Sequence, residues 1–290
     1  MKRNMKDSLF ILFQHIVPQH LLSRLVGTIA DSETPWVKNL FIRWFAKKYQ
    51  INMAEAREEI PSNYPSFNAF FTRELKEGAR PIDQDQNAVV SPADGAISQL
   101  GKIESGRIFQ AKGRGYALTT LLGGDQQRAE PFVKGNFATI YLSPRDYHRV
   151  HMPVAGTLTH TTYIPGDLFS VNQTTAEGVE QLFARNERLV AYFDTEFGPM
   201  AMVLVGAMIV AGIETVWSGQ EAPRLKKPIH TPFINQSSSP IRLEKGEEMG
   251  RFKLGSTVIL LFGENRISWD ESLDATSPVQ LGKTIALASA

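Results

Sequence analysis

Three residue types that together perform nucleophilic catalysis stand at well-separated places in this chain. Asp94 lies in "SPADG", His148 and His151 lie in "SPRDYHRVHMP", and Ser256 lies in "KLGSTVILLF". A Ser-His-Asp triad is defined by geometry and by the role of each group, so the order along the chain carries no weight. Taken singly, Asp94 has the ordinary interpretation of a turn residue and Ser256 that of a serine at a strand edge. The sequence therefore suggests a triad that the fold has to assemble.

The peptide bond between Gly255 and Ser256 is unhindered, and it precedes a Thr-Val-Ile-Leu-Leu-Phe run that is typical of a buried strand. Glycine in such a place often marks a bulge or a close approach of the backbone. The other interpretation is that this peptide bond is itself a reaction site. A glycine on the acyl side leaves room for attack by the neighbouring hydroxyl.

A metal site is a second interpretation of the histidine pair. His148 and His151, beside Arg145 and Asp146, form a dense polar cluster directly after the apolar run "FATIYL". Histidines three or four residues apart recur in zinc sites. No H-E-x-x-H motif and no evident third ligand accompany them, and a chain without cysteine has no thiolate ligand, no cysteine nucleophile and no disulfide.

Two alternative functions stay open at this point. One is a zinc metallopeptidase of sandwich fold. The other is a membrane-associated lipoyl/biotinyl-like carrier domain, although "SPADG" and "PVAG" lack the displayed lysine that a carrier needs. The net charge of the whole chain, +1, gives no support for nucleic-acid binding.

Strand-like runs separated by Gly, Pro and Asp make up the chain from residue 88 onward. Turn signals every 8–12 residues or so are typical of a β sandwich or barrel. "SPADGAI" and "MPVAGTL" share a Pro-x-x-Gly pattern that resembles the strand-turn pattern of the lipoyl/biotinyl-like sandwich. The longest apolar run, residues 197–213, is 17 residues long, short of the roughly 20 needed to span a bilayer, and its Pro and Gly residues favour two buried strands. With helices ahead of this β-rich core, the predicted fold class is α+β.

Residues 8–50 have the pattern of amphipathic helices, and residues 1–50 carry eight Lys and Arg against three Asp and Glu, a net charge of +5. The third predicted helix begins at Pro35, a favourable first position, and its polar face holds Lys38, Asn39 and Arg43. Its apolar face holds Trp36, Val37, Leu40, Phe41, Trp44 and Phe45, of which we expect Trp36, Leu40, Phe41 and Trp44 to contact lipid. The aromatic face and the basic charge favour an interfacial membrane helix over packing on the protein's own core. We therefore predict a membrane-associating segment, 1–62, ahead of a β-rich domain, 63–290.

Five segments taken together resemble the bacterial, pyruvoyl-dependent phosphatidylserine decarboxylases, and the resemblance runs over nearly the whole chain. They are "FNAFFTRELK", "SPADG", "LSPRDYHRVHMP", "PGDLFSVN" and "FKLGSTVILLF". The resemblance implies decarboxylation of phosphatidylserine to phosphatidylethanolamine with a covalent pyruvoyl group, without a metal and without pyridoxal phosphate. It also implies that the precursor cleaves itself between Gly255 and Ser256 into a β chain, 1–255, and an α chain, 256–290.

In the cleavage that the resemblance implies, the Ser256 hydroxyl attacks the carbonyl of Gly255 and turns the amide into an ester. His151 acts as the general base, and Asp94 holds its tautomer and stabilises the imidazolium. Elimination then releases the β chain, and the former Ser256 loses ammonia to become the pyruvoyl group and the Schiff-base site for the substrate amine.

The remaining expectations also follow from the resemblance. His148 is the expected proton donor in decarboxylation, and Phe169 and Val171 are expected to line the lipid or pyruvoyl pocket. The expected partners are phosphatidylserine in an anionic membrane surface and a second αβ unit in a homodimer, with no nucleic acid. The expected location is the cytoplasmic face of the bacterial inner membrane.

Overall fold

The computed structural model describes most of the 290 residues of the chain. Outside the described residues lie 1–4, 112, 209–211, 224–226, 234–238, 254–255 and 290, and Ser256 is described by its backbone alone. Gly255, one half of the predicted cleavage site, is therefore outside the described residues.

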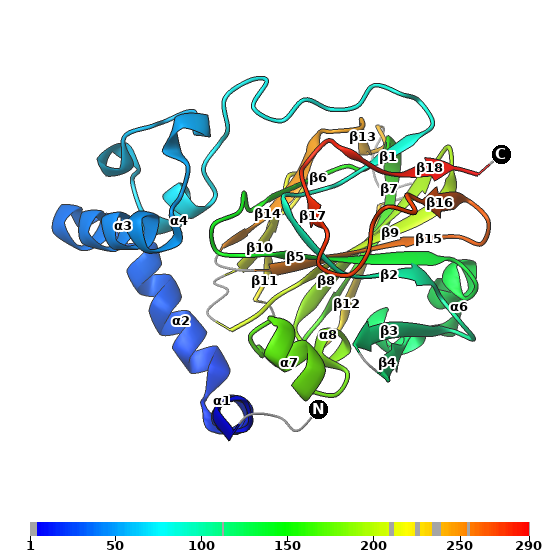
Figure 1. Cartoon of the computed structure of the whole chain (residues 1–290), viewed down its shortest axis with the longest axis horizontal. Helices are drawn as coiled ribbons and strands as arrows, with labels where there is room; N and C mark the ends of the chain where they lie inside the picture. Colours follow the sequence, from blue (N-terminus) through cyan, green and yellow to red (C-terminus); the bar gives the residue numbers. More distant parts are fainter. Residues whose placement is uncertain are drawn as a thin grey trace.

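The N-terminal region folds into the predicted helices, which lie along one side of the molecule (Figure 1). They are α1 (Met5–Ile16), α2 (Gln19–Ala30) and α3 (Pro35–Tyr49), followed by two single turns, η1 (Met53–Glu55) and η2 (Pro61–Asn63), and by α4 (Phe67–Phe71). Pro35 occupies the first turn of α3 as expected. Ser66 caps α4, because its side chain accepts a hydrogen bond from the backbone N–H of Ala69.

Helices α2, α3 and α4 share a small core of their own. Its buried members are Ala30, Ile42, Phe45, Tyr64, Phe67, Phe70 and Phe71. This core joins residues on both sides of position 62, so α4 packs with the N-terminal helices although it lies in the predicted β-rich domain. The division at residue 62 itself stays a prediction.

The polar face predicted for α3 is wrong at one position. Lys38 is buried, and its Nζ donates hydrogen bonds to the carbonyl of Ser62 at 2.8 Å and to the side chain of Asn39 at 3.1 Å. The predicted apolar face also divides. Phe45 lies in the small core and Phe41 packs against it, while the stripe formed by Trp36, Leu40 and Trp44 is exposed to solvent.

The rest of the chain is β-rich and almost entirely antiparallel. The strands are β1 (Ala88–Val90), β2 (Gly95–Lys102), β3 (Arg107–Ala111), β4 (Arg114–Ala117), β5 (Asn136–Leu142), β6 (Arg149–His151), β7 (Gly156–Ile164), β8 (Arg188–Thr195), β9 (Gly198–Val205), β10 (Gly212–Thr215), β11 (Gly219–Ala222), β12 (Ile229–Pro232), β13 (Arg242–Leu243), β14 (Glu248–Lys253), β15 (Ser256–Phe262), β16 (Ile267–Trp269), β17 (Pro278–Val279) and β18 (Thr284–Ala288). Short helical turns connect some of them: α5 (Leu118–Leu121), α6 (Gln126–Ala129), η3 (Glu130–Phe132), α7 (Gln173–Gly178) and α8 (Leu182–Arg185).

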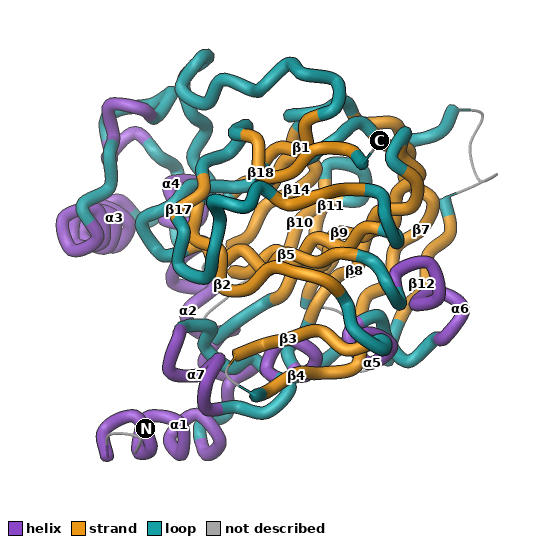
Figure 2. The backbone as a smooth tube through the Cα atoms, turned by 45° about the vertical axis from the view of Figure 1, so that its right-hand side comes forward, coloured by secondary structure: helices purple, strands orange, loops and turns teal. Residues whose placement is uncertain are grey.

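In the described part of the chain these strands form four open sheets. The largest has nine strands in the order β12-β7-β8-β9-β15-β5-β2-β17, with β13 added beside β7. A four-stranded sheet, β11-β10-β14-β6, a three-stranded sheet, β1-β18-β16, and the β3–β4 hairpin complete the set, and Figure 2 shows how the strands layer against one another. The predicted α+β class is confirmed.

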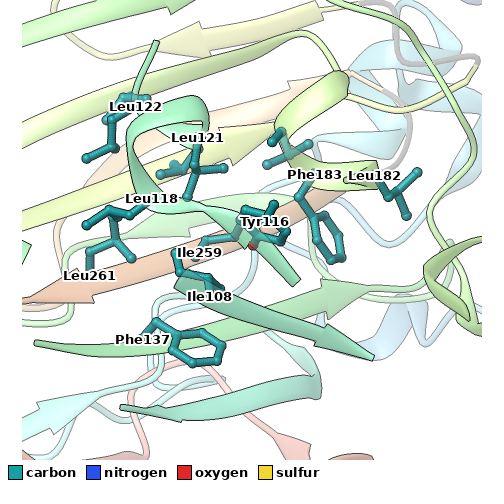
Figure 3. Packing of buried hydrophobic residues seen from close by; sticks show 14 of the residues in the cluster. Ile108, Tyr116, Leu118, Leu121, Leu122, Phe137, Leu182, Phe183, Ile259 and Leu261 are labelled. Atoms are coloured by element: carbon teal, nitrogen blue, oxygen red, sulfur yellow. The ribbon is translucent and has the colours of Figure 1, made fainter. Parts of the chain in front are cut away.

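Strand β15 lies in the middle of the largest sheet, between β9 and β5, and pairs antiparallel with both. Its side chains alternate between two cores, since successive strand residues point to opposite faces. Ile259 and Leu261 join one core, seen in Figure 3, while Val258 and Leu260 join the other. Burial on both faces explains why the segment reads as an unbroken apolar run.

The two strands predicted within residues 197–213 are confirmed, because the apolar run forms β9 and the beginning of β10. No single described helix is long and apolar enough to cross a membrane. Helices α1 and α2 would suffice together by length and composition, but they meet at a bend of 86°.

Candidate active site

Asp94 lies in the tight connection between β1 and β2 and is 8% exposed. The connection is held locally, because the Ser91 hydroxyl donates to the carbonyl of Ala93 at 2.7 Å. Gly95 is required next, since a Cβ there would lie 2.4 Å from the carbonyl oxygen of Tyr141 on the paired strand β5. The "SPADG" motif therefore presents a carboxylate from a fixed turn against the sheet.

The carboxylate of Asp94 is fully occupied by one arginine and one backbone amide. Nε of Arg80 donates to both of its oxygens at 3.0 Å, and Nη2 donates to Oδ2 at 2.7 Å. The backbone N–H of Leu281 donates to Oδ1 at 2.9 Å. Burial opposes the charge on Arg80, but its hydrogen bonds to Asp94 and to Glu55 outweigh burial and raise its pKa.

His151 ends strand β6, and its ring is held by a backbone carbonyl. Its Nδ1 donates to the carbonyl oxygen of Gly246 at 2.8 Å, so in the neutral ring Nε2 carries the lone pair. That Nε2 is buried and has no hydrogen-bond partner among the described residues. Burial lowers the pKa of His151, opposed by the Gly246 carbonyl and by the charges of Glu248 and Asp94. A neutral histidine with a free lone pair is what a general base requires.

The tautomer of His151 is thus set by a group that sequence reasoning missed. We expected Asp94 to hold it, but Asp94 pairs with Arg80 and its described link to His151 is electrostatic. Gly246 adopts a positive φ of 83°, which glycine tolerates best. Its carbonyl can therefore turn toward the ring. The "EKGEEMG" turn was visible in the sequence, but a backbone carbonyl leaves no side-chain signal.

Asp94 and His151 line two adjoining cavities. His151 lines one of about 630 Å³, and Asp94 lines a smaller one of about 170 Å³. Arg80, Leu75 and Tyr147 line both and form the wall between them. Burial raises the pKa of Tyr147 to about 12, so its phenol keeps its proton at neutral pH. The fold therefore brings two of the predicted residues to one site.

His148 has a different environment from His151, because residues three apart on an extended chain face opposite ways. Its side chain is 0% exposed and its ring stacks on Phe71 with centroids 4.0 Å apart. Burial, assisted by the charge of Arg73, lowers the pKa of His148 to about 3. The backbone of Ser143 and Pro144 partly opposes that shift without reaching hydrogen-bond geometry within the described chain. His148 is therefore neutral at physiological pH.

Ser256 is placed by its backbone at the first residue of β15, opposite Leu142 at the end of β5. On the neighbouring sheet, the backbone carbonyl of His148 accepts a hydrogen bond from the backbone N–H of Phe252 at 3.0 Å, four residues before Ser256. His151 pairs further away along the same ladder, opposite Glu248. His148 therefore lies closer than His151 to the start of β15 along this ladder. The described residues show no contact between His151 and Ser256.

Unpartnered polar atoms gather around the start of β15. The hydroxyls of Ser143 and Thr257 and both ring nitrogens of His148 are buried and have no hydrogen-bond partner in the part of the chain that the structure describes. Ser143 follows Leu142, and Thr257 follows Ser256. A group with carbonyl oxygens at position 256 would accept hydrogen bonds from these hydroxyl and ring N–H groups. Such pairing is expected, because buried polar atoms are ordinarily hydrogen-bonded.

Arg73 is a second residue that sequence reasoning did not single out, although it lies in "FFTRELK". It is buried, lines the cavity of Asp94 and a further cavity of about 470 Å³, and acts on His148 through its charge. Its Nε has no partner in the described structure. Burial lowers its pKa, but an arginine stays charged at neutral pH.

Phe169 and Val171 are both buried in the apolar core that also contains Ile259 and Leu261, and neither lines a cavity described above. Phe169 meets the ring of His15 on α1 edge-on, at 4.9 Å between centroids. The guanidinium of Arg185 lies over its other side, 4.6 Å from the ring centroid. Their predicted place in the substrate pocket stays a prediction.

No three His, Asp or Glu side chains converge in the described ranges so as to hold a metal ion. His148 is enclosed by the aromatic ring of Phe71, and His151 donates one nitrogen to a carbonyl. The histidine pair therefore presents no shared ligand set there.

Comparison with known proteins gives a consistent result over the whole length. A family model described as phosphatidylserine decarboxylase matches residues 67–287, and one described as PSD matches residues 9–50. The chain is 59% identical to the phosphatidylserine decarboxylase proenzyme of Stutzerimonas stutzeri strain A1501 over 285 residues, which cover 98% of this chain and 96% of that protein. The proenzymes so named from Pseudomonas fluorescens Pf-5 and Pseudomonas entomophila L48 are 60% and 61% identical over 283 residues, covering 98% of this chain and 98% and 99% of those proteins. The chain belongs to the phosphatidylserine decarboxylase family.

Proposed function

We propose that this protein decarboxylates phosphatidylserine to phosphatidylethanolamine, using a pyruvoyl group that it makes from Ser256. Family membership over the full length supports the reaction, and the word proenzyme in the relatives' names supports a maturation step. The observation that carries the site is the buried, unpartnered Nε2 of His151, held in one tautomer at a cavity beside Asp94 and Arg80.

Self-cleavage begins at Ser256. His151 Nε2 takes the hydroxyl proton while Oγ attacks the Gly255 carbonyl, so the C–N bond breaks and an ester forms. Abstraction of the Cα proton of residue 256 then expels the Gly255 carboxylate, and water replaces the nitrogen of the resulting dehydroalanine, releasing ammonia. Asp94, which pairs with Arg80, stabilises the imidazolium form of His151 by its field.

Once formed, the ketone at position 256 supplies the electron sink that loss of CO2 from an amino acid requires. The chain holds that position beside β5, and from the next residue, Thr257, β15 is paired on both sides in the largest sheet. Ser143, His148 and Thr257 supply the unpartnered polar atoms around it.

The headgroup of the substrate brings a carboxylate and a phosphate to the site. Arg73 is the described cation that best suits them, because it is buried, lines two cavities and has an unpartnered Nε. His148 would relay the proton that replaces CO2: one ring nitrogen gives its proton as the other takes one up, so the ring stays neutral, as its lowered pKa requires.

Membrane association is part of this proposal. Exposed apolar side chains follow one another along α1, α2 and α3: Leu9, Leu12, Phe13, Ile16, Leu21, Leu25, Ile29, Trp36, Leu40 and Trp44. A lipid surface is a suitable partner for such a series with a net positive charge. We propose peripheral binding at the cytoplasmic face of the inner membrane. The homodimer stays a prediction.

The finer fold assignment is also a proposal. The two Pro-x-x-Gly segments lead directly into β2 and β7, two strands of the largest sheet. This supports, without deciding, a sandwich of the lipoyl/biotinyl-like kind. Superposition on an experimental structure of a relative would decide it.

The test of the mechanism is chemical. The mature protein should separate under denaturing conditions into residues 1–255 and a small piece that begins at position 256. That piece should be one ammonia lighter than a free serine terminus would make it, resist Edman degradation and react with phenylhydrazine. Ser256→Ala, His151→Ala and Asp94→Asn should leave one full-length, inactive chain. An intact wild-type chain that decarboxylates phosphatidylserine would refute the pyruvoyl mechanism.

A further inference from the structure

Helix α1 docks on the protein in an unusual way, because its apolar residues are mostly exposed and a polar one is fully buried. The buried side chains of this described helix are Ile11 and Gln14, and Gln14 is 0% exposed. Its Oε1 accepts a hydrogen bond from the backbone N–H of Ser170 at 2.8 Å. Burying an amide side chain costs free energy unless the amide is hydrogen-bonded, so hydrophobic packing alone does not explain Gln14 at this contact.

The contact of Gln14 is one of three on the same stretch of backbone, residues 166–170. Gln19 Oε1 accepts from the N–H of Leu168 at 2.6 Å, and His20 Nε2 donates to the carbonyl of Gly166 at 2.9 Å. Gln19 Nε2 also donates to the carbonyl of Gln14 at 2.7 Å, across the break between α1 and α2. The two helices thus hold every second residue of the stretch.

The intervening residues of the stretch bond to the opposite side. Asp167 exchanges backbone hydrogen bonds with Arg185 and Glu187, both at 2.8 Å. Phe169 bonds through its N–H and its carbonyl to the side chain of Asn186, at 3.1 and 2.8 Å. Residues 166–170 therefore behave as a strand with two partners: the catalytic body on one edge and the N-terminal helices on the other.

The same two helices carry the exposed apolar series. On α1 and α2 this series consists of Leu9, Leu12, Phe13, Ile16, Leu21, Leu25 and Ile29, whereas Gln14 and Gln19 face the body. A surface that binds these side chains also restrains the helices that carry them, because backbone hydrogen bonds join the residues of an α-helix into one unit. Binding there restrains the residues that hold 166–170.

We infer that Gln14, Gln19 and His20 form a latch that couples membrane binding to the geometry of residues 166–170. They are positioning residues and touch no reacting atom. The inference rests on the proposed function and on the prediction that Phe169 and Val171 line the lipid or pyruvoyl pocket and form its wall. A lipid surface would hold α1 and α2 still, the latch would hold 166–170, and the wall would be ready for substrate only at the membrane.

Hydrogen exchange tests the latch without any enzyme assay. In Gln14→Met/Gln19→Met the amides of Leu168 and Ser170 lose their acceptors, and we expect them to exchange about fivefold faster or more, the factor for one net hydrogen bond of about 1 kcal/mol. Vesicles of phosphatidylcholine and phosphatidylglycerol, which contain no substrate, should slow these amides in the parent protein and not in the variant. Gln173→Met makes the same substitution on an exposed site of α7 and should behave as the parent does. Unchanged exchange in the variant, or equal slowing by vesicles, would overturn the latch.

Kinetics tests the consequence. With phosphatidylserine in vesicles, the double variant should show a KM about fivefold higher, with a smaller change in kcat, while cleavage and vesicle binding match the parent. Gln19→Glu keeps the acceptor for Leu168 and should recover part of the loss. A parent protein that neither cleaves nor decarboxylates would refute the proposed function and leave the exchange result standing. Faster exchange with an unchanged KM would refute the coupling alone.

Discussion

At the scale of single residues, the site contains two histidines from one short segment, His148 and His151, whose rings have different surroundings. His151 keeps a free Nε2 at a cavity because the Gly246 carbonyl occupies its Nδ1. His148 is stacked on Phe71 and sealed from solvent. Both are neutral at physiological pH, since burial lowers both pKa values. The first is suited to accept a proton and the second to relay one.

The rate of self-cleavage should respond to pH through His151. Its pKa is lowered from 6.5 in the folded precursor, so the basic form persists when the pH falls to that value. We expect more than half of the maximal rate to remain at pH 6.5 and the half-maximal rate to lie below that pH. Cleavage of precursor made by cell-free synthesis, followed on denaturing gels, measures this. A half-maximal rate above 6.5 would contradict the assignment.

The burial of His148 should make the precursor sensitive to acid. Its pKa is about 3 in the folded chain against 6.5 in the unfolded chain, so between these values the unfolded state binds the extra proton. Its neutral form therefore favours folding fully above pH 6.5, and that advantage shrinks as the pH falls. In the uncleaved Ser256→Ala background, the urea midpoint should drop between pH 7 and pH 5. His148→Phe in that background, which keeps the stack on Phe71, should drop less.

At the scale of elements, some hydrophobic residues of α3 pack against α4 and others are exposed to solvent. Trp36, Leu40 and Trp44 recur at every fourth position and are exposed, Trp36 by 74%. Phe41, predicted with them as a lipid contact, stacks instead on Phe67 of α4 at 4.0 Å between centroids. One helix therefore holds the helical core together and presents a separate stripe outward.

Substitution should separate the two jobs of α3. Trp36→Ser/Leu40→Ser/Trp44→Ser should weaken binding to anionic vesicles about tenfold or more, because even partial burial of three large side chains exceeds 1.4 kcal/mol. Cleavage and Tm should stay near those of the parent. Phe41→Ser should do the reverse and lower Tm by several degrees, since it leaves a gap against Phe67. Co-sedimentation and thermal unfolding distinguish the outcomes, and an unfolded triple variant would place the stripe in the core.

At the scale of the whole molecule, the proposed cleavage before Ser256 would cut the chain without dividing the fold. The α chain of 35 residues contains β15, which lies inside the largest sheet, and β18, which pairs with β1 and β16. Four side chains of β15, from Val258 to Leu261, are completely buried. The two chains would therefore share two hydrophobic cores, one on each face of the sheet.

The mature α and β chains should stay together without a covalent link. Buried apolar side chains stabilise by about 1.5–3 kcal/mol each, so β15 alone resists dissociation. Native mass spectrometry and gel filtration should find one species holding both chains, and urea should release the α chain only together with loss of the β-sheet signal. Release of the α chain from folded protein would contradict this arrangement.

The sequence by itself determined the elements and the residue types. The buried strand after Ser256, the paired strands of residues 197–213 and the N-terminal helices follow from local periodicity and from Pro and Gly, which act over a few residues. The resemblance carried by the motifs predicted the family. These features need no knowledge of distant contacts.

Only the tertiary structure decided the partners. The pairing of Asp94 with Arg80, the Gly246 carbonyl on His151, the burial of Lys38 and the latch on residues 166–170 each join segments that are separate in the chain, and three of them involve backbone groups that every residue possesses. The type of a side chain does not indicate which backbone carbonyl or backbone amide it will contact. Burial, which lowers the pKa of both histidines, likewise depends on the packing of distant elements. The sequence therefore named the chemical groups, and the fold set their protonation and their partners.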